Sequence, residues 1–287
     1  MTNFLKAFKK SDAWRLLKKN ARFWICLTII IGVAVLGIVG PYMTKYGPKT
    51  PTGEIMAPPS SEHPFGTDYF GYDVFAETVY GIRVSLMVGL FAAIIATLVG
   101  VLLGMIAGLR GGIIDYVVDT IINILLAIPP ILIMLLIAAF MGKRGIIELG
   151  LLIGLLSWQW TARAVRSQVA SLKVSDYVAT SMLSGNSFIR IMFKDIFPNI
   201  ASYSLLSFVI QLGSAMLTVI TLEFLGLGAS EWSLGAIIQL SVLWGAIPLG
   251  VWWWWFYPGV IIVALIASLY LIVVSLEEVF NPRLRRE

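Results

Sequence analysis

The chain has 287 residues, of which 59% are hydrophobic and 13% are charged, and its mean hydropathy is +0.88. A soluble domain of this length could not bury so much apolar surface in one core, so the composition indicates an integral membrane protein. The net charge of +5 comes from residues that flank apolar segments and form no basic patch with interleaved aromatic residues, which argues against nucleic-acid binding. Cys26 is the only cysteine, so the chain can form neither a disulfide framework nor a cysteine metal site within itself.

Six stretches are apolar enough to cross a hydrocarbon core of ~30 Å, which takes ~20 helical residues. Because lipid offers no partner to an unpaired backbone group, we expect each stretch to be a helix and the fold to be an all-α, polytopic membrane protein. The predicted spans are residues 23–43, 85–107, 114–141, 146–160, 200–222 and 255–275. Pro129-Pro130 should kink the third span, and the short fourth span should continue into residues 161–165.

The stretch between Glu231 and Glu277 holds 45 residues without a charge, which is long enough for two spans. We predict only one, because residues 234–256 contain three glycines, Pro248 and a cluster of tryptophans. That composition is typical of a re-entrant or interfacial segment. Residues 223–254 are therefore predicted to be an external re-entrant segment.

The positive charges predict the orientation in the bilayer. With six spans and both termini in the cytoplasm, 16 of the 21 lysines and arginines face inward, as the positive-inside rule requires. The chain then divides into a basic cytoplasmic N-terminus (1–22), a first transmembrane anchor (23–43), an external segment (44–84), a transmembrane core (85–275) and a basic cytoplasmic C-terminus (276–287). The anchor is too long for the apolar region of a signal peptide and Gly40-Pro41-Tyr42 is no cleavage site, so we expect it to be retained.

Regular patterns mark the faces of three spans. Small residues recur every four positions on the second span and favour close helix packing; they are Ala92, Ala96, Gly100, Gly104 and Gly108. A polar stripe follows the fifth span, at Ser204, Ser207, Gln211, Ser214, Thr218 and Thr221. Such a stripe must face protein or water, so packing and a lining for a hydrophilic translocation path both stay open. Asp115, Asp119 and Asn123 form a shorter stripe on the third span, which we interpret as a solvated helix end.

Sites for chemistry are scarce in this sequence. Proton- or ion-driven carriers usually place an ionisable residue deep in the membrane, but the middle of every predicted span lacks one, so the energy source is expected outside this chain. His63 is the only histidine and there is no glycine-rich phosphate loop ending in Lys-Ser or Lys-Thr, so we expect no catalytic triad, metal, cofactor or ATP in this chain. A self-sufficient channel or secondary carrier is the main competing class; a membrane enzyme would need a nucleophile and base that the sequence does not supply.

Residues 161–199 form a polar loop between two apolar stretches and carry five basic residues, Arg163, Arg166, Lys173, Arg190 and Lys194. Asp176 to Asn199 has the pattern of two short helices, separated at Gly185 and ended by Pro198. This loop is too regular for a simple tether. We expect a cytoplasmic partner to bind it.

The loop resembles the cytoplasmic loop of permease subunits in binding-protein-dependent ABC importers. Gly185 and Phe197-Pro198-Asn199 match its signature, whereas Ala179-Thr180-Ser181 stands where Glu-Ala-Ala is usual. The resemblance narrows to the second permease subunit of the dipeptide, oligopeptide and nickel branch. It rests on residues 63–68, 71–74 and 80–86, on Glu223 to Gly228 and on Asn281 to Arg286. It covers most of the chain from residue 60 onward, while residues 1–59 and 229–251 are only generically similar.

The resemblance implies a type I importer fold in a prokaryotic cell membrane and half of a translocation pathway for di- or oligopeptides. The implied partners are a homologous second permease, two cytoplasmic ATPase subunits that bind ATP and Mg²⁺, and an external substrate-binding protein. A nickel-chelate or other small-solute permease of the same family is the alternative. Tyr177 to Ser184 would be the coupling helix, Gly185 its turn, and Asn186 to Phe197 the return to the membrane. The implied ATPase-coupling residues are Asp176, Tyr177, Ala179, Thr180, Ser181, Gly185, Arg190 and Pro198.

Overall fold

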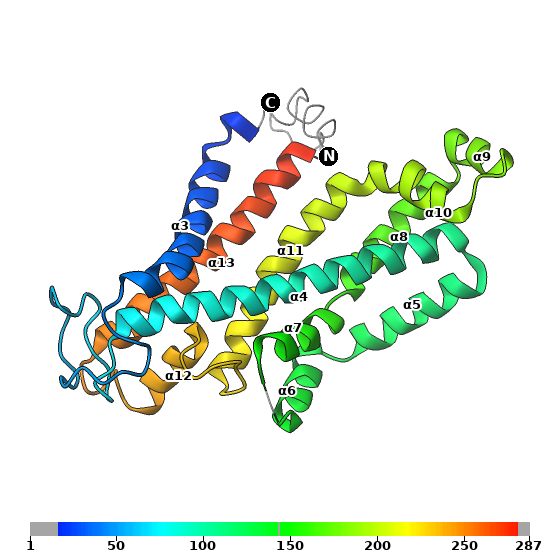
Figure 1. The fold of residues 1–287 in the computed structure, drawn as a ribbon. Helices are drawn as coiled ribbons and strands as arrows, with labels where there is room; N and C mark the ends of the chain where they lie inside the picture. The colour runs from blue at the N-terminus through cyan, green and yellow to red at the C-terminus, as the bar shows by residue number, and fades with distance from the viewer. Residues whose placement is uncertain (1–16, 143, 281–287) are drawn as a thin grey trace. The chain divides into compact units, whose positions relative to one another are not determined.

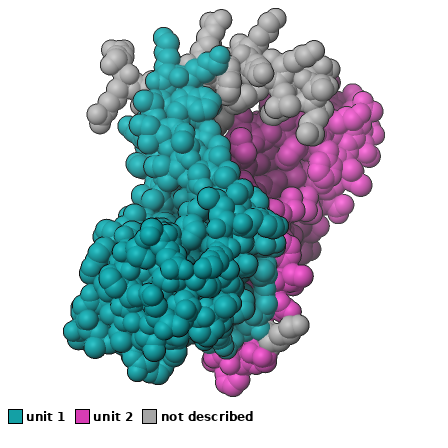
Figure 2. All heavy atoms as spheres, turned by 60° about the vertical axis from the view of Figure 1, so that its left-hand side comes forward, with its two compact units in different colours: residues 1–89, 143–146, 216–287 teal, residues 90–142, 147–215 magenta. Residues whose placement is uncertain are grey.

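The computed structural model describes residues 17–142 and 144–280. Within these ranges every regular element is a helix, and extended pairing is limited to isolated bridges, so the predicted all-α fold is confirmed. The chain divides into two compact units, coloured separately in Figure 2. Unit 1 holds residues 1–89, 143–146 and 216–287, and unit 2 holds residues 90–142 and 147–215. Of the predicted basic N-terminus (1–22) and C-terminus (276–287), residues 1–16 and 281–287 lie outside the described residues, and with them the segment from Asn281 to Arg286 on which the family resemblance partly rests.

Unit 1 is built from helices that lie near the two ends of the sequence. Helix α3 (Ala21–Met43) runs beside α13 (Trp252–Phe280) (Figure 1), and the short α12 (Leu234–Leu243) also packs on α13. Gly37 and Gly40 let α3 approach α4 (Val74–Arg110) closely: a Cβ at Gly37 would lie 2.6 Å from Cγ2 of Ile82, and one at Gly40 would lie 2.7 Å from Val79.

Unit 2 contains the later part of α4 and the short helices that follow it. These are α5 (Gly112–Ala127), α6 (Pro130–Phe140), α7 (Ile146–Leu155), α8 (Gln159–Lys173), α9 (Asp176–Leu183), α10 (Phe188–Arg190) and the π-helix η1 (Ile191–Ile196). Helix α11 (Phe197–Phe224) continues directly from η1, and its last turns belong to unit 1.

Four helical segments of the described chain are long and apolar enough to cross a membrane. They are Ala21–Met43, Val74–Arg110, Phe188–Phe224 and Trp252–Val279. A fifth crossing is formed if α5 and α6 together make one broken span. The protein is thus a multi-pass membrane protein. The six-span count and the cytoplasmic position of both termini stay predictions.

The third predicted span differs most from expectation. Instead of one kinked helix over residues 114–141, α5 and α6 meet at a bend of 80°. Pro129 and Ile128 have extended backbone angles, with ψ of 117° and 131°, because a residue that precedes proline is pushed out of the helical region. Two consecutive prolines therefore break the helix where one would only kink it. The fourth predicted span, residues 146–160, contains only the ten-residue α7 before a turn leads into α8.

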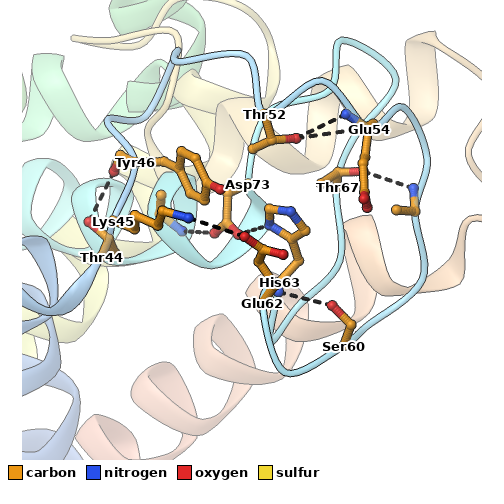
Figure 3. Close-up of polar contacts among 12 residues, drawn as sticks. Thr44, Lys45, Tyr46, Thr52, Glu54, Ser60, Glu62, His63, Thr67 and Asp73 are labelled. Atoms are coloured by element: carbon orange, nitrogen blue, oxygen red, sulfur yellow. Dashed lines mark hydrogen bonds and ion pairs between the residues drawn. The ribbon is translucent and has the colours of Figure 1, made fainter.

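The segment that precedes α4 is folded onto unit 1. Isolated bridges join Pro51 to Tyr72 and Thr67 to Asp73, and the Trp253 indole donates a hydrogen bond of 3.0 Å to the Thr67 carbonyl. His63 is buried and points at Asp73, with 2.7 Å between Nδ1 and a carboxylate oxygen (Figure 3). His63, the only histidine of the sequence, is thus a buried structural residue of this fold. Helix α4 starts at Val74, eleven residues before the predicted start of the second span.

Candidate functional site

The predicted coupling helix is present as α9, which covers Asp176–Leu183 and ends one residue before the predicted limit. Gly185 follows with φ +73°, a left-handed conformation that favours glycine. The backbone N–H of Asn186 donates to the carbonyl of Ser181 at 3.3 Å and that of Gly185 to Met182 at 3.1 Å. These two bonds close the helix and turn the chain back, as the sequence pattern predicted.

Side-chain hydrogen bonds fix α9 against the chain that returns to α11. Ser181 Oγ donates to Asp195 Oδ2 at 2.5 Å, and Asn186 Nδ2 donates to Ser181 Oγ at 3.0 Å. Asp195 lies in the π-helix η1, and its own backbone carbonyl accepts a hydrogen bond of 2.7 Å from Asn199 Nδ2. The serine in the altered triplet is therefore held inside the loop and is only half exposed. Beneath α9, Val178 is fully buried in a core shared with α4, α8 and η1.

The outer face of the loop is exposed and partly apolar. Leu183 is 89% exposed and Val174 81%, with Tyr177 and Ile189 also open to solvent. Of the predicted coupling residues, Asp176, Tyr177, Thr180, Gly185, Arg190 and Pro198 are exposed, while Ala179 and Ser181 are half-buried. Exposed leucine and valine on an otherwise polar loop are typical of a protein–protein contact. The sequence pattern could not reveal this face, because it depends on which side of α9 packs on the core.

Helix α8, which leads into the loop, lies directly on the small-residue ridge of α4. A Cβ at Gly104 would lie 2.7 Å from the Ala162 carbonyl oxygen, and one at Gly108 would lie 2.7 Å from the Arg166 carbonyl oxygen. Gly100 makes an equally close approach to Thr161. The packing interpretation of this ridge is confirmed.

An ion-pair cluster joins α8 to α5. Arg166 contacts both carboxylate oxygens of Asp115, one of them at 2.9 Å from Nη2, and its Nη1 lies 2.8 Å from Asp119. Arg163 Nη2 donates to Asn123 Oδ1 at 2.6 Å. Asn123 is exposed and the two carboxylates are only half-buried, which agrees with a solvated helix end, but the basic residues of the loop also reach back to them, which the sequence did not predict. Arginine can bind two carboxylates with fixed geometry, so α8 is held to α5 as well as to α4.

The polar stripe on α11 is not uniform. Ser207 and Gln211 are buried, and Gln211 Nε2 donates to the Ser157 carbonyl at 2.6 Å and to Thr161 Oγ1 at 3.1 Å. Gln211 therefore joins α11 to the start of α8, which favours packing at this position. The other members of the stripe, Ser204, Ser214, Thr218 and Thr221, are half-buried. The translocation-path interpretation stays a prediction for them.

A buried carboxylate in unit 1 is a candidate functional group that the sequence reading missed. Glu223 is fully buried near the end of α11. Both carboxylate oxygens lie 2.9 Å from Ser85 Oγ on α4. Oε2 also accepts a hydrogen bond of 3.1 Å from the backbone N–H of Gly235 at the start of α12. The N–H of Leu234 in turn donates to Ser85 Oγ at 3.2 Å. One carboxyl group thus joins three helices. The sequence feature that could have identified it is a single Glu within an apolar run.

The helices define a class, the multi-pass α-helical membrane proteins, and comparison with known proteins assigns the family. Residues 100–286 match the family described as binding-protein-dependent transport system inner membrane component. The chain belongs to this family of ABC-importer permeases. Residues 10–59 match the N-terminal TM domain of oligopeptide transport permease C. That match corrects the expectation that residues 1–59 are only generically similar.

Curated relatives match about three quarters of the chain. The chain is 34% identical over 218 residues to the dipeptide transport system permease protein DppC of Bacillus subtilis, which covers 76% of this chain and 68% of that protein. It is 32% identical over 227 residues to DppC of Alkalihalophilus pseudofirmus, covering 77% and 74%. It is also 31% identical over 219 residues to the oligopeptide transport system permease protein OppC of Bacillus subtilis, covering 76% and 71%.

Proposed function

We propose that this chain is one of two homologous permease subunits of an ATP-driven importer and that di- or oligopeptides are its substrates. The printed names of its relatives support the substrate class, since they are dipeptide and oligopeptide transport permeases. In the proposed assembly both termini are cytoplasmic and the chain crosses the membrane six times. An external binding protein delivers the peptide, and two partner ATPases bind ATP and Mg²⁺.

The observation that carries the proposal is the construction of the 161–199 loop. Helix α9 presents an exposed, partly apolar face, and Gly185 ends it in a left-handed turn. Such a helix is suited to dock into a complementary groove on a partner. Hydrolysis needs no group from this chain in this scheme, because the permease contributes the contact and the pathway.

The contacts of α8 suggest how movement of α9 would reach the membrane. Helix α8 packs on the glycine ridge of α4 and is ion-paired to α5 through Arg166. A displacement of α9 by closing ATPases would therefore move α4, α5 and α8 together, as a rigid-body change in a bistable transporter. The differential contact of the ATPases with the two states supplies the driving force.

Co-purification and reconstitution test the proposal. After mild detergent extraction, a tagged version of this chain should retain a second permease and two ATPase chains. In proteoliposomes, ATP hydrolysis by that complex should rise when the binding protein carries a peptide, and peptide should accumulate in the compartment that the ATPase subunits face. Peptide flux through liposomes that contain this chain alone would instead identify a self-sufficient channel or carrier.

A further inference from the structure

An apolar cleft of about 420 Å³ opens in unit 1 between the end of α11, helix α12 and the first turns of α13. Its walls include Ile220, Phe224, Ile238, Ile247, Trp255 and Val263. Several of these side chains face outward: Val263 is 67% exposed and Ile247 66%. The cleft is therefore open to whatever surrounds this part of the chain.

The lining offers almost no polar partner. Thr221 contributes a hydroxyl, but its Oγ1 already donates to the Leu217 carbonyl at 2.7 Å within α11. The N–H of Gly235 at the floor is bound by Glu223. A peptide would leave its amide groups unpaired in such a cleft, at a large cost in free energy. Apolar walls of this kind are suited to bind a hydrocarbon chain.

The course of the cleft follows the direction of a lipid chain. Along α13 its lining runs from Trp255 to Val263, a rise of about 12 Å along the helix axis. Trp252 and Trp255 mark the start of this candidate membrane span, and tryptophan is enriched where hydrocarbon meets the headgroups. The cleft thus starts at an interfacial tryptophan and continues along the exposed surface of a membrane-spanning helix.

The cleft combines apolar walls with a position along a candidate membrane span, and it is open at the surface of the chain. We propose that this cleft binds one acyl chain of a bilayer phospholipid, seated between α12 and α13. The bound chain would fill the gap beside the short helix α12 and support it against the span. This proposal depends only on the chain lying in a membrane, not on the transported substrate.

Gly259 gives a direct means of filling the cleft. It lies in the lining, and a Cβ placed there would meet only Ile238 Cδ1, at 4.0 Å. Gly259→Leu should therefore occupy the cleft without a backbone clash. The matched control is Gly32→Leu, since Gly32 lies in the apolar helix α3, is exposed, and would place its Cβ with nothing within 4 Å.

The test uses membranes that contain the full chain with its co-expressed partner subunits and a phospholipid with a photoreactive group near the end of one acyl chain. Adducts should map to the cleft at residues 238, 247 and 263. Gly259→Leu should reduce the yield of these adducts at least about tenfold, the change expected when the dissociation constant rises about tenfold. Gly32→Leu should leave them unchanged. If Gly259→Leu accumulates poorly, direct capture of the occupant from Val263 decides the proposal.

A second arm identifies the occupant directly. A photoreactive amino acid placed at Val263 should yield adducts with phospholipid. If it captures a second permease polypeptide in place of lipid, the cleft is a subunit interface and the acyl-chain proposal is wrong. Equal lipid labelling of the cleft in wild type and Gly259→Leu would likewise overturn it, because the labelled surface would then be ordinary lipid contact.

Discussion

Ser85 and Glu223 are 138 residues apart in sequence, yet the Ser85 hydroxyl lies 2.9 Å from both oxygens of the Glu223 carboxylate, in a site closed to solvent. The same carboxylate accepts the N–H of Gly235, the second residue of α12. A Cβ at Gly235 would lie 2.6 Å from Glu223 Cβ, so the glycine is needed for this approach. The Glu223 carboxyl group also lies at the N-terminal, positive end of α12. Glu223 therefore sets the position of α12 relative to α4 and α11.

Removing the Glu223 side chain should destabilise the protein more than changing its charge. Glu223→Ala leaves a cavity and two buried donors without an acceptor, which costs about 2–5 kcal/mol. Glu223→Gln keeps one acceptor oxygen and the shape, and its cost should be less than half as large. Thermal unfolding of the purified complex measures both. An equal loss in the two variants would show that the charge, and not the hydrogen-bond geometry, positions α12.

The glycine ridge of α4 should tolerate no side chain. Gly104→Ala places a Cβ 2.7 Å from a backbone carbonyl oxygen of α8, and overpacking of this kind typically costs about 1–3 kcal/mol. Gly142→Ala is the control, because a Cβ there meets nothing within 4 Å. The melting temperature should fall for Gly104→Ala and stay unchanged for Gly142→Ala. A stable Gly104→Ala protein would mean that α8 can move away from α4 at no cost.

The features that the sequence predicted well are those with a local cause. The small-residue period on α4 depends on helix geometry alone, and α9 with its Gly185 turn depends on adjacent residues. Each is present where it was predicted. The bend between α5 and α6 was underestimated because the angle depends on what each half packs against after Pro129-Pro130 frees the backbone.

The features that were missed need partners far along the chain. Arg166 reaches Asp115 across 51 residues, and Gln211 reaches Ser157 across 54. A single sequence does not say which distant polar groups meet, so the pairing of Asp115 with Arg166 was not predicted and Gln211 was taken as one member of a uniform stripe. Glu223 was hidden for the same reason.

Gly185 should be replaceable only by residues that accept a left-handed backbone. Its φ is +73° and a Cβ would meet nothing within 4 Å, so any penalty comes from backbone strain alone. Gly185→Val should cost at least about 1 kcal/mol and reduce peptide-stimulated ATP hydrolysis and uptake together. Gly185→Asn adds a side chain of similar size but tolerates this conformation, so it should retain most of both activities. Full coupling in Gly185→Val would contradict the role of the turn.

Protonation of Asp68 should stabilise the folded segment that precedes α4 at mildly acidic pH. Burial raises the pKa of Asp68 to about 6, even though the N–H groups of Tyr72 and Phe70 bind its Oδ1 and favour the charged form. The folded state therefore binds a proton more tightly than the unfolded state, in which Asp68 has its ordinary pKa of 3.8. Stability should rise by on the order of 2 kcal/mol as pH falls through the interval between these two pKa values, and this contribution is absent at neutral pH.

Amide hydrogen exchange of residues 66–74 as a function of pH, corrected for intrinsic rates, measures this effect. Asp68→Asn preserves an acceptor for Phe70 and Tyr72 but cannot titrate. It should be at least as protected at pH 7 and should lose the pH dependence that the wild type shows in the acidic range. An unchanged pH profile in Asp68→Asn would assign the titration to other groups.

Cysteine labelling along α11 should separate the packing residues of the polar stripe from those that line a path. The only native cysteine, Cys26, is buried, and a Cys26→Ser background lets single cysteines be introduced at residues 207, 211, 214 and 218. A water-soluble thiol reagent reacts with hydrated thiolates and poorly with thiols in packed protein. Residues 207 and 211 should be protected, because Ser207 and Gln211 are buried, whereas 214 and 218 should label if they line a path. Met216, which is also fully buried, is the negative control.

Trapping the assembled importer with a non-hydrolysable ATP analogue should then change the side from which 214 and 218 react, since alternating access closes one gate as it opens the other. Protection of 214 and 218 in both states would leave the whole stripe as packing and move the search for the pathway to another helix.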